Sequence, residues 1–380
     1  MRWNFLICGV AAIFAGSYLD SIRGPLLPVL TREFSLSYAE SSWFFIAGNL
    51  AAFIANLLLL PLFSRWGEKT VTLWLCLWGL FTTGFAFLTT DYIRLIILAM
   101  LVGSTISTLG VACNVLALKG TNAQYRARTL SGLHMIFGVG SLLAPGILGF
   151  FLNRGISWPN TLLPFAAGVL FLAFELRRLP EEPPTQSQTT TLARPTFAQW
   201  LIISCFGVYV CCEVMLSMWL TPYLVEHRHL SVASAAPYVS GFFLMMALSR
   251  LVCVLFLRPR HETLVLVGCL FVSGLAFTMG HAGWLPGFAL AGVMGPFFPL
   301  FMARISRAFE SQLTRLTIWS LATVQGSLAL SHFVVGAFTD AVGIQNSYQA
   351  PFFLGALTLL LFSLYVREER GLLYSLRSKK

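Results

Sequence analysis

Charged residues are scarce in this sequence. Asp, Glu, Lys and Arg make up 11% of its 380 residues, whereas about a quarter is usual for a soluble protein. Hydrophobic residues reach 57%, which is more apolar surface than a soluble core can bury. A soluble globular protein is therefore excluded, and we expect the chain to lie in a lipid bilayer. At about 20 residues per crossing, its length accommodates about twelve helices.

Motifs of enzymes and metal sites are also missing. The sequence contains no recognisable nucleophile set, phosphate-binding loop or CxxC pair. All eight cysteines lie in apolar runs, where they serve as small packing residues. Cys211 and Cys212 are adjacent and would point about 100° apart on a helix, which disfavours a shared metal. We therefore expect a protein that is not an enzyme and holds no metal or cofactor.

Twelve apolar runs follow one another between charged or Gly, Pro and Asn punctuation, which predicts an all-α membrane protein. The runs are residues 5–30, 41–63, 71–89, 93–118, 129–152, 159–176, 199–224, 233–257, 263–281, 283–303, 313–338 and 347–366. The first resembles the core of a signal peptide, but apolar sequence continues to Leu30 without a convincing cleavage site, so we predict a retained helix.

One long polar stretch divides the runs into six and six. It contains the two prolines and the Gln, Ser and Thr run of residues 183–191, which have no periodicity and are typical of a flexible linker. The sequence therefore predicts an N-terminal six-helix bundle at 1–178, a linker at 179–198 and a C-terminal six-helix bundle at 199–380.

The two halves share a weak internal repeat. A shift of 194 residues pairs Pro28 with Pro222 and Ser37 with Ser231, and Gly-Ser-Leu at 140–142 recurs at 326–328. Duplicated halves predict two pseudo-symmetric bundles, an arrangement that alternating-access transporters use.

The positive-inside rule gives an orientation. Of the 25 Lys and Arg residues, Arg23 and Arg250 lie inside apolar runs. One set of loops holds only four: Arg32, Arg94, Arg154 and Arg228. All the others lie in the opposite loops, the linker and the tails. We therefore expect both termini in the cytoplasm, in a plasma membrane such as a bacterial inner membrane. Basic residues confined to such loops do not indicate nucleic-acid binding.

Several motifs resemble the major facilitator superfamily, and most closely its fucose/proton symporter branch. These are the loop Leu62-Phe63-Ser64-Arg65-Trp66-Gly67-Glu68-Lys69, the segment Tyr209-Val210-Cys211-Cys212-Glu213 with Trp219 and Tyr223-Leu224, Ser249-Arg250, and the turn from Gly336 through Asp340 to Gly343. Asn114 matches the branch's asparagine, whereas Gly110 stands where that branch has a coupling glutamate. The resemblance implies two six-helix bundles around a central solute site, and conformational gating roles for Arg65, Arg250 and Asp340.

Two carboxylates at membrane depth are candidate proton-coupling groups, because a charge there is costly and needs a function or a partner. Asp20 is three residues from Arg23 on one helical face, so the two either pair or line a cavity together. Glu213 shares a face with Tyr209 and Ser217, a polar stripe that we expect to face the central cavity. A structural ion pair or hydrogen bond is the competing interpretation for each.

Other polar or aromatic residues inside the runs are candidate solute-binding groups. The set comprises Arg23, Asn114, His134, Tyr209, Trp219, Gln325 and His332. For the histidines, packing within the bundles is the competing interpretation, and for Trp219 it is packing or anchoring at the membrane interface.

These features predict a secondary transporter that moves a small polar solute, sugar-like or an organic acid, by alternating access. We expect proton-coupled import by a monomer. Proton-driven export of a drug, metabolite or siderophore is the alternative. A receptor or scaffold would need a long soluble appendage, and a channel is disfavoured by the duplicated single chain.

Overall fold

The computed structural model describes residues 2–122, 125–180, 196–256, 259–308 and 313–377. Most of the predicted linker lies outside these ranges. Every regular element in them is a helix. The elements are α1 (Trp3–Glu33), α2 (Tyr38–Ala86), α3 (Tyr92–Lys119), α4 (Arg126–Asn153), η2 (Trp158–Leu162), α5 (Leu163–Arg177), α6 (Phe197–Met218), α7 (Leu220–Glu226), α8 (Val232–Phe256), η3 (Pro259–His261), α9 (Glu262–His281), α10 (Pro286–Leu290), η4 (Ala291–Met294), α11 (Phe297–Ala308), α12 (Leu313–Val342), α13 (Ile344–Ser347) and α14 (Ala350–Arg377).

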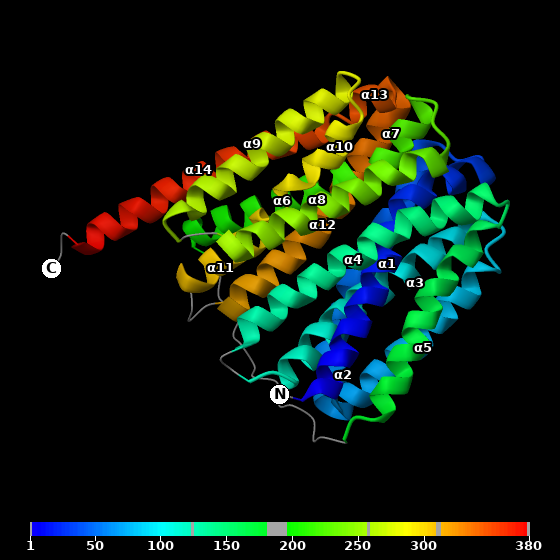
Figure 1. Cartoon of the computed structure of the whole chain (residues 1–380), viewed down its shortest axis with the longest axis horizontal. Coiled ribbons are helices and arrows are strands. Elements are labelled where there is room, and N and C mark those ends of the chain that lie inside the picture. Colours follow the sequence, from blue (N-terminus) through cyan, green and yellow to red (C-terminus); the bar gives the residue numbers. More distant parts are fainter. Residues whose placement is uncertain (1, 123–124, 181–195, 257–258, 309–312, 378–380) are drawn as a thin grey trace.

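The predicted all-α membrane fold is confirmed. Ten segments of the described residues are long and apolar enough to cross a membrane. The second half of α2 and helix α12 lie beside them in the bundles and occupy the two remaining predicted spans (Figure 1). The predicted spans 41–63 and 71–89 correspond to the two helical parts of α2, which are separated by a kink at Gly67, where the backbone is not helical. Gly67 has a φ of 75°, a conformation that favours glycine.

The helices form two bundles that meet along a long interface. In the first, α1 packs against α3, α4 and α5, and α2 packs against α3. In the second, α6 packs against α12 and α14, and α8 against α10 and η4. Between the bundles, α4 packs along α8 and α2 along α12.

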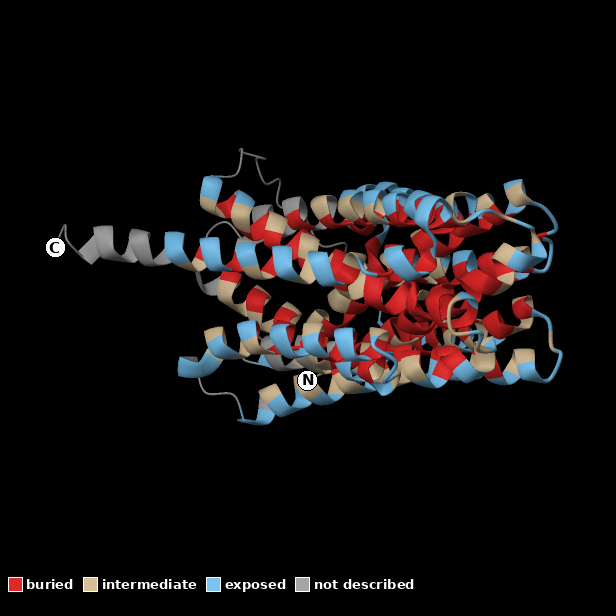
Figure 2. Ribbon diagram, turned by 90° about the horizontal axis from the view of Figure 1, so that it is seen from above, coloured by how far each residue is buried: buried red, intermediate tan, exposed pale blue. Residues whose placement is uncertain are grey.

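The two chain termini lie at one end of the molecule, which we call the terminal end (Figure 1). The opposite end, which carries the loops 34–37, 87–91, 154–157, 227–231 and 282–285, is called the loop end. Buried residues concentrate towards the loop end (Figure 2). Among the residues whose burial the structure describes, the bundles are therefore packed more closely there than at the terminal end.

The internal repeat has a structural counterpart at the loop end. Ser37 caps α2 by accepting a hydrogen bond from the backbone N–H of Glu40, and Ser231 accepts one from Ser234 at the start of α8. Arg32 and Glu226, which are also 194 residues apart, form an ion pair of 3.1 Å. Residues related by a two-fold rotation can touch only near its axis, so the pseudo-two-fold axis passes close to this pair.

The cysteines pack as the sequence predicts. All eight are free thiols, and seven of them are buried. Among the described residues, no group of three or more His, Cys, Asp or Glu side chains could hold a metal ion.

Candidate functional site

A cavity of about 260 Å³ lies between the two bundles. It is lined from α1, α3 and α4 on one side and from α6, α8 and α11 on the other. The lining residues are Ile13, Gly16, Ser17, Ile106, Gly110, Asn114, Phe137, Glu213, Arg250 and Phe298. Glu213, Arg250 and Asn114 are all residues that the sequence singles out. The cavity therefore combines an apolar wall with a few polar groups, as small-molecule sites usually do.

Glu213 projects into the cavity from α6 and is held by its neighbour one turn away. The Tyr209 hydroxyl donates to Glu213 Oε2 at 2.5 Å, and the Met294 carbonyl oxygen lies 3.3 Å from the same hydroxyl. The Tyr209 ring is buried and stacks on Phe297 at 4.6 Å. Ser217 completes the predicted stripe, but its hydroxyl donates to the Glu213 backbone carbonyl rather than to the carboxylate.

Arg250 faces Glu213 from α8. Its Nε donates to the Gly295 carbonyl at 2.9 Å, and one terminal nitrogen lies 3.9 Å from Glu213 Oε2. Gly295 allows this approach, because a side chain there would place its Cβ 2.6 Å from the Met246 carbonyl oxygen. The side chains of Arg250 and Glu213 are 12% and 20% exposed, so the ion pair is largely buried but open to the cavity.

Asp20 and Arg23 form an ion pair within one turn of α1. The Arg23 guanidinium also lies over the Phe45 ring, 5.7 Å from its centroid. The sequence leaves pairing and cavity lining as alternatives, and the structure shows the pair. Neither residue is part of the cavity lining.

Trp219 and His332 lie in an aromatic layer near the loop end rather than on the cavity wall. His332 stacks on Phe45 at 4.1 Å, and its Nδ1 accepts a hydrogen bond of 3.1 Å from the indole N–H of Trp219. Both side chains are buried. Tyr38 packs beside Trp219 with ring centroids 6.2 Å apart. We call Tyr38, Phe45, Trp219 and His332 the loop-end seal, since they join α2 to α12 and to the α6–α7 junction.

Polar contacts between the bundles reinforce this seal. The Asp340 carboxylate accepts hydrogen bonds from the backbone N–H groups of Tyr38 and Ala39, both at 2.8 Å. It thus caps the first turn of α2 from the other bundle, where the helix dipole favours a negative charge. Together with the Arg32–Glu226 pair and a bond from Ser240 to the Leu142 carbonyl, these contacts close the loop-end half.

The other predicted residues occupy different places. Asn114 lines the cavity, and its amide donates to the Gly110 carbonyl at 2.9 Å. The oxygen of the Gln325 side chain is buried and has no hydrogen-bond partner among the described residues. Arg65 lies at the terminal end with its guanidinium 4.9 Å from the Trp66 ring centroid. His134 belongs to α4, but its side chain lies outside the described residues.

Sequence reasoning misses several cavity residues. Ser17 and Gly16 lie one turn before Asp20 on α1, and small size alone does not distinguish them from packing residues. Phe137 and Phe298 resemble the many other apolar residues of the chain. At the terminal end, Glu68 forms an ion pair of 2.7 Å with Lys119 of α3, a long-range contact that sequence spacing does not reveal.

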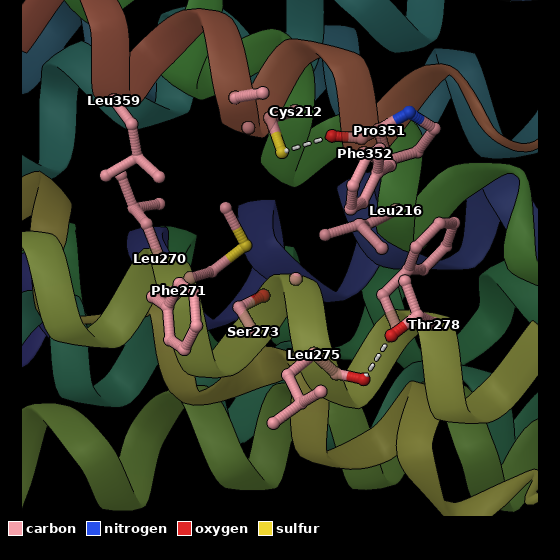
Figure 3. Close-up of a pocket in the computed structure, with 15 residues that line it drawn as sticks. Cys212, Leu216, Leu270, Phe271, Ser273, Leu275, Thr278, Pro351, Phe352 and Leu359 are labelled. Atoms are coloured by element: carbon pink, nitrogen blue, oxygen red, sulfur yellow. Dashed lines mark hydrogen bonds between the residues drawn. The ribbon is translucent and has the colours of Figure 1, made fainter.

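A second cavity of about 280 Å³ opens towards the outside of the molecule between α9 and α14 (Figure 3). Its wall is apolar. The polar groups along it are satisfied locally, since the Cys212 thiol donates to the Pro351 carbonyl and Thr278 to the Leu275 carbonyl. This groove offers an incoming solute no charged group.

Three solved structures that are similar to this chain in fold are transporters. A bacterial homologue of the human lysosomal transporter Spinster, in an inward-facing and occupied conformation, is 15% identical with a TM-score of 0.69 over 96% of this chain and 97% of that one. The inward-open xylose transporter XylE from E. coli is 14% identical with a TM-score of 0.73 over 95% of each chain. A point mutant of the nucleoside transporter NupG is 12% identical with a TM-score of 0.75 over 95% of this chain and 99% of that one.

No curated protein matches the sequence. A family model does match it, over residues 5–286, which is well over half of the chain. The match agrees with two helical bundles around a central cavity and with the transporters that share this fold. The protein is thus a transporter rather than an enzyme, and the chain belongs to the Major Facilitator Superfamily.

Proposed function

We propose that this protein is a secondary active transporter that imports a small polar solute together with protons, with Glu213 as the coupling group. One observation carries the proposal: a carboxylate on the cavity wall is held by the Tyr209 hydroxyl and faced by Arg250. A carboxyl group in this place can take a proton from one side of the membrane and release it on the other. Asp20 is a weaker candidate, because Arg23 already compensates its charge.

The conformation fits one half of a transport cycle. Among the residues whose side chains the structure describes, which leaves out most of 126–134 and 306–322 at the terminal end, the hydrogen bonds and the ion pair that join the bundles lie in the loop-end half. The distribution of Lys and Arg supports cytoplasmic termini in a bacterial inner membrane, so the closed end is the outer one. The cavity then belongs to an inward-facing state of a monomeric transporter, and opening of the seal exposes Glu213 and Arg250 to the outside.

The sequence resemblance to the fucose/proton symporter branch supports proton symport. One protein of similar fold, 13% identical, is a D-xylose-proton symporter, so this fold accommodates such coupling. The cavity volume of about 260 Å³ supports a small solute.

The test is solute-driven proton movement in proteoliposomes. Addition of a transported solute to a weakly buffered suspension should make the external medium more alkaline. Glu213→Gln should abolish this signal while retaining exchange of the solute down its own gradient. Glu33→Gln is the matched control, because Glu33 is exposed at the end of α1 and distant from the cavity lining. Solute accumulation that survives in Glu213→Gln, or that a protonophore leaves unchanged, would contradict the proposal. Acidification on solute addition would indicate export.

A further inference from the structure

The charges on the cavity wall restrict the solute more than its volume does. Of the ten lining residues that the structure describes, Glu213 and Arg250 alone are charged, so this part of the wall is neutral when both are ionised. The Asp20–Arg23 pair nearby is also neutral as a unit. His332 accepts a hydrogen bond through Nδ1, which identifies a neutral imidazole. Protonation of Glu213 therefore leaves one net positive charge at the cavity.

Arg250 is positioned to bind an anion in that state. Its Nε is fixed to the Gly295 carbonyl, so the outer edge of the guanidinium is held in place. That edge makes no other hydrogen bond to a described residue, since Glu213 Oε2 at 3.9 Å is beyond hydrogen-bond distance. The planar guanidinium presents two N–H donors along this edge, and their spacing matches the two oxygens of a carboxylate, which can accept two parallel hydrogen bonds from them.

Protonation of Glu213 and binding of an anion to Arg250 favour each other. A buried guanidinium that loses its counter-charge is strongly unfavourable, and an arriving anion removes that cost. Conversely, an anion beside an ionised Glu213 meets like charge, which a proton on Glu213 removes. By linkage, the proton and the anion each raise the affinity of the cavity for the other by the same factor.

We infer that the transported solute is a small organic anion whose carboxylate binds the outer edge of Arg250 when Glu213 is protonated, so that one proton and one anion cross together without net charge. This rests on the proposed function and names its substrate class. Asn114 supplies a side-chain amide to the polar part of the solute. Phe137, Phe298 and Ile106 pack against its apolar part, within a cavity of about 260 Å³.

The titratable groups around Glu213 do not replace it in this role. Tyr209 and Cys212 lie on its own helix, Arg250 faces it from α8, and the Cys269 thiol on α9 faces Tyr209. Tyr209 acts as a donor to the carboxylate. Cys212 points away from the cavity towards the α9–α14 groove, where it donates to the Pro351 carbonyl (Figure 3).

The first experiment measures binding through the thermal stability of the purified transporter. The probes are acetate, lactate and benzoate, each compared with its neutral amide, at about pH 5.5 and pH 8. We expect at least one carboxylate to stabilise the wild type at the lower pH, with about tenfold weaker affinity at the higher pH and no effect of the amides. Arg250→Gln should lose the stabilisation, whereas Arg154→Gln, an exposed arginine, should keep it. Glu213→Gln, which mimics the protonated state, should bind with the same affinity at both pH values.

The second experiment measures charge movement. In proteoliposomes with a potassium diffusion potential, a pH gradient should drive accumulation of the bound carboxylate, and an added potential of about 100 mV should leave it unchanged. A proton that crosses with a neutral solute would instead gain about fifty-fold accumulation from that potential.

The outcomes separate this inference from the proposed function. The inference of an organic anion as solute is overturned if no carboxylate binds, if the amides bind equally well, or if Arg250→Gln retains carboxylate binding. A neutral solute whose proton-driven uptake is lost in Glu213→Gln would overturn the inference and leave the proposed function intact. Carboxylate binding that requires Arg250, with proton coupling retained in Glu213→Gln, would overturn the proposed function, and with it the role of Glu213 as the proton site.

Discussion

Substitution of Asp340 by Ala should shift the transporter towards the conformation that is open at the loop end. The substitution removes both hydrogen bonds that the carboxylate accepts from Tyr38 and Ala39 across the bundle interface. Loss of a side chain that caps a helix N-terminus costs about 0.5–2 kcal/mol. Because these bonds join the two bundles, only the closed state loses them. A shift of about 1–2 kcal/mol changes the ratio of open to closed molecules about five- to thirty-fold.

Pulsed electron paramagnetic resonance can measure this ratio. Spin labels on non-native amino acids at Asn153 and Gln345, two exposed positions on opposite bundles near the loop end, leave the eight native thiols in place. The long-distance population should grow in Asp340→Ala. It should grow less in Asp340→Asn, because an asparagine side chain keeps one acceptor oxygen.

Asp91 provides a matched control. It caps α3 at the same end by accepting a hydrogen bond from the Arg94 backbone N–H at 3.0 Å, and it pairs with the Arg94 side chain at 3.3 Å. Both contacts lie inside one bundle, so Asp91→Ala should lower thermal stability without changing the ratio of open to closed molecules. An equal shift in both variants, or none in Asp340→Ala, would refute the role of Asp340 in holding the loop end closed.

Two further predictions concern stability, measured by thermal unfolding in detergent. Gly103→Ala should destabilise the contact between α2 and α3 strongly, because its Cβ would lie 2.1 Å from the Gly48 carbonyl oxygen, whereas Gly146→Ala, with no atom within 4 Å of the new Cβ, should change stability little. Equal effects of the two would contradict this packing. Asp20→Asn should lower the free energy of unfolding by about 3–5 kcal/mol, because it leaves Arg23 unpaired, and the additional substitution Arg23→Gln should restore most of that loss. A double variant that is no more stable than Asp20→Asn would show that the broken ion pair is not the cause.

The fold could be predicted from the sequence because a bilayer imposes one simple rule, that every span is a long apolar helix. The breaks within individual spans could not be predicted from the sequence. The span predicted at 283–303 consists of α10, η4 and α11, and the one at 199–224 is interrupted at Trp219. The first break has a tertiary cause: Gly292 and Gly295 lie against the backbone of α8, so closely that an added Cβ would meet its carbonyl oxygens. Periodicity within one segment carries no information about such a contact.

The site was predictable one residue at a time rather than as a constellation. Glu213 with Tyr209 and the Asp20–Arg23 pair each lie within one turn of a helix, so sequence spacing suffices to bring them together. The approach of Arg250 to Glu213 depends on how α8 packs against the broken segment at Gly295, which is a long-range property. The sequence also leaves two interpretations for Trp219 and His332, a solute site or packing, and the structure buries both in the loop-end seal.

The seal and the cavity share a helix, which gives alternating access a physical basis in this chain. Glu213 lies six residues before Trp219, a rise of about 9 Å along α6 at 1.5 Å per residue. Tyr209 fixes the carboxylate from the same helix, and Trp219 holds His332 of α12 through its indole N–H. Residues 213–218 are helical and Trp219 follows them directly as the C-cap of α6. In the proposed cycle, a rotation of α6 that moves Glu213 away from Arg250 should therefore also move Trp219 against His332. On the proposed mechanism, we therefore expect proton binding at Glu213 and opening of the loop end to be coupled through this part of α6.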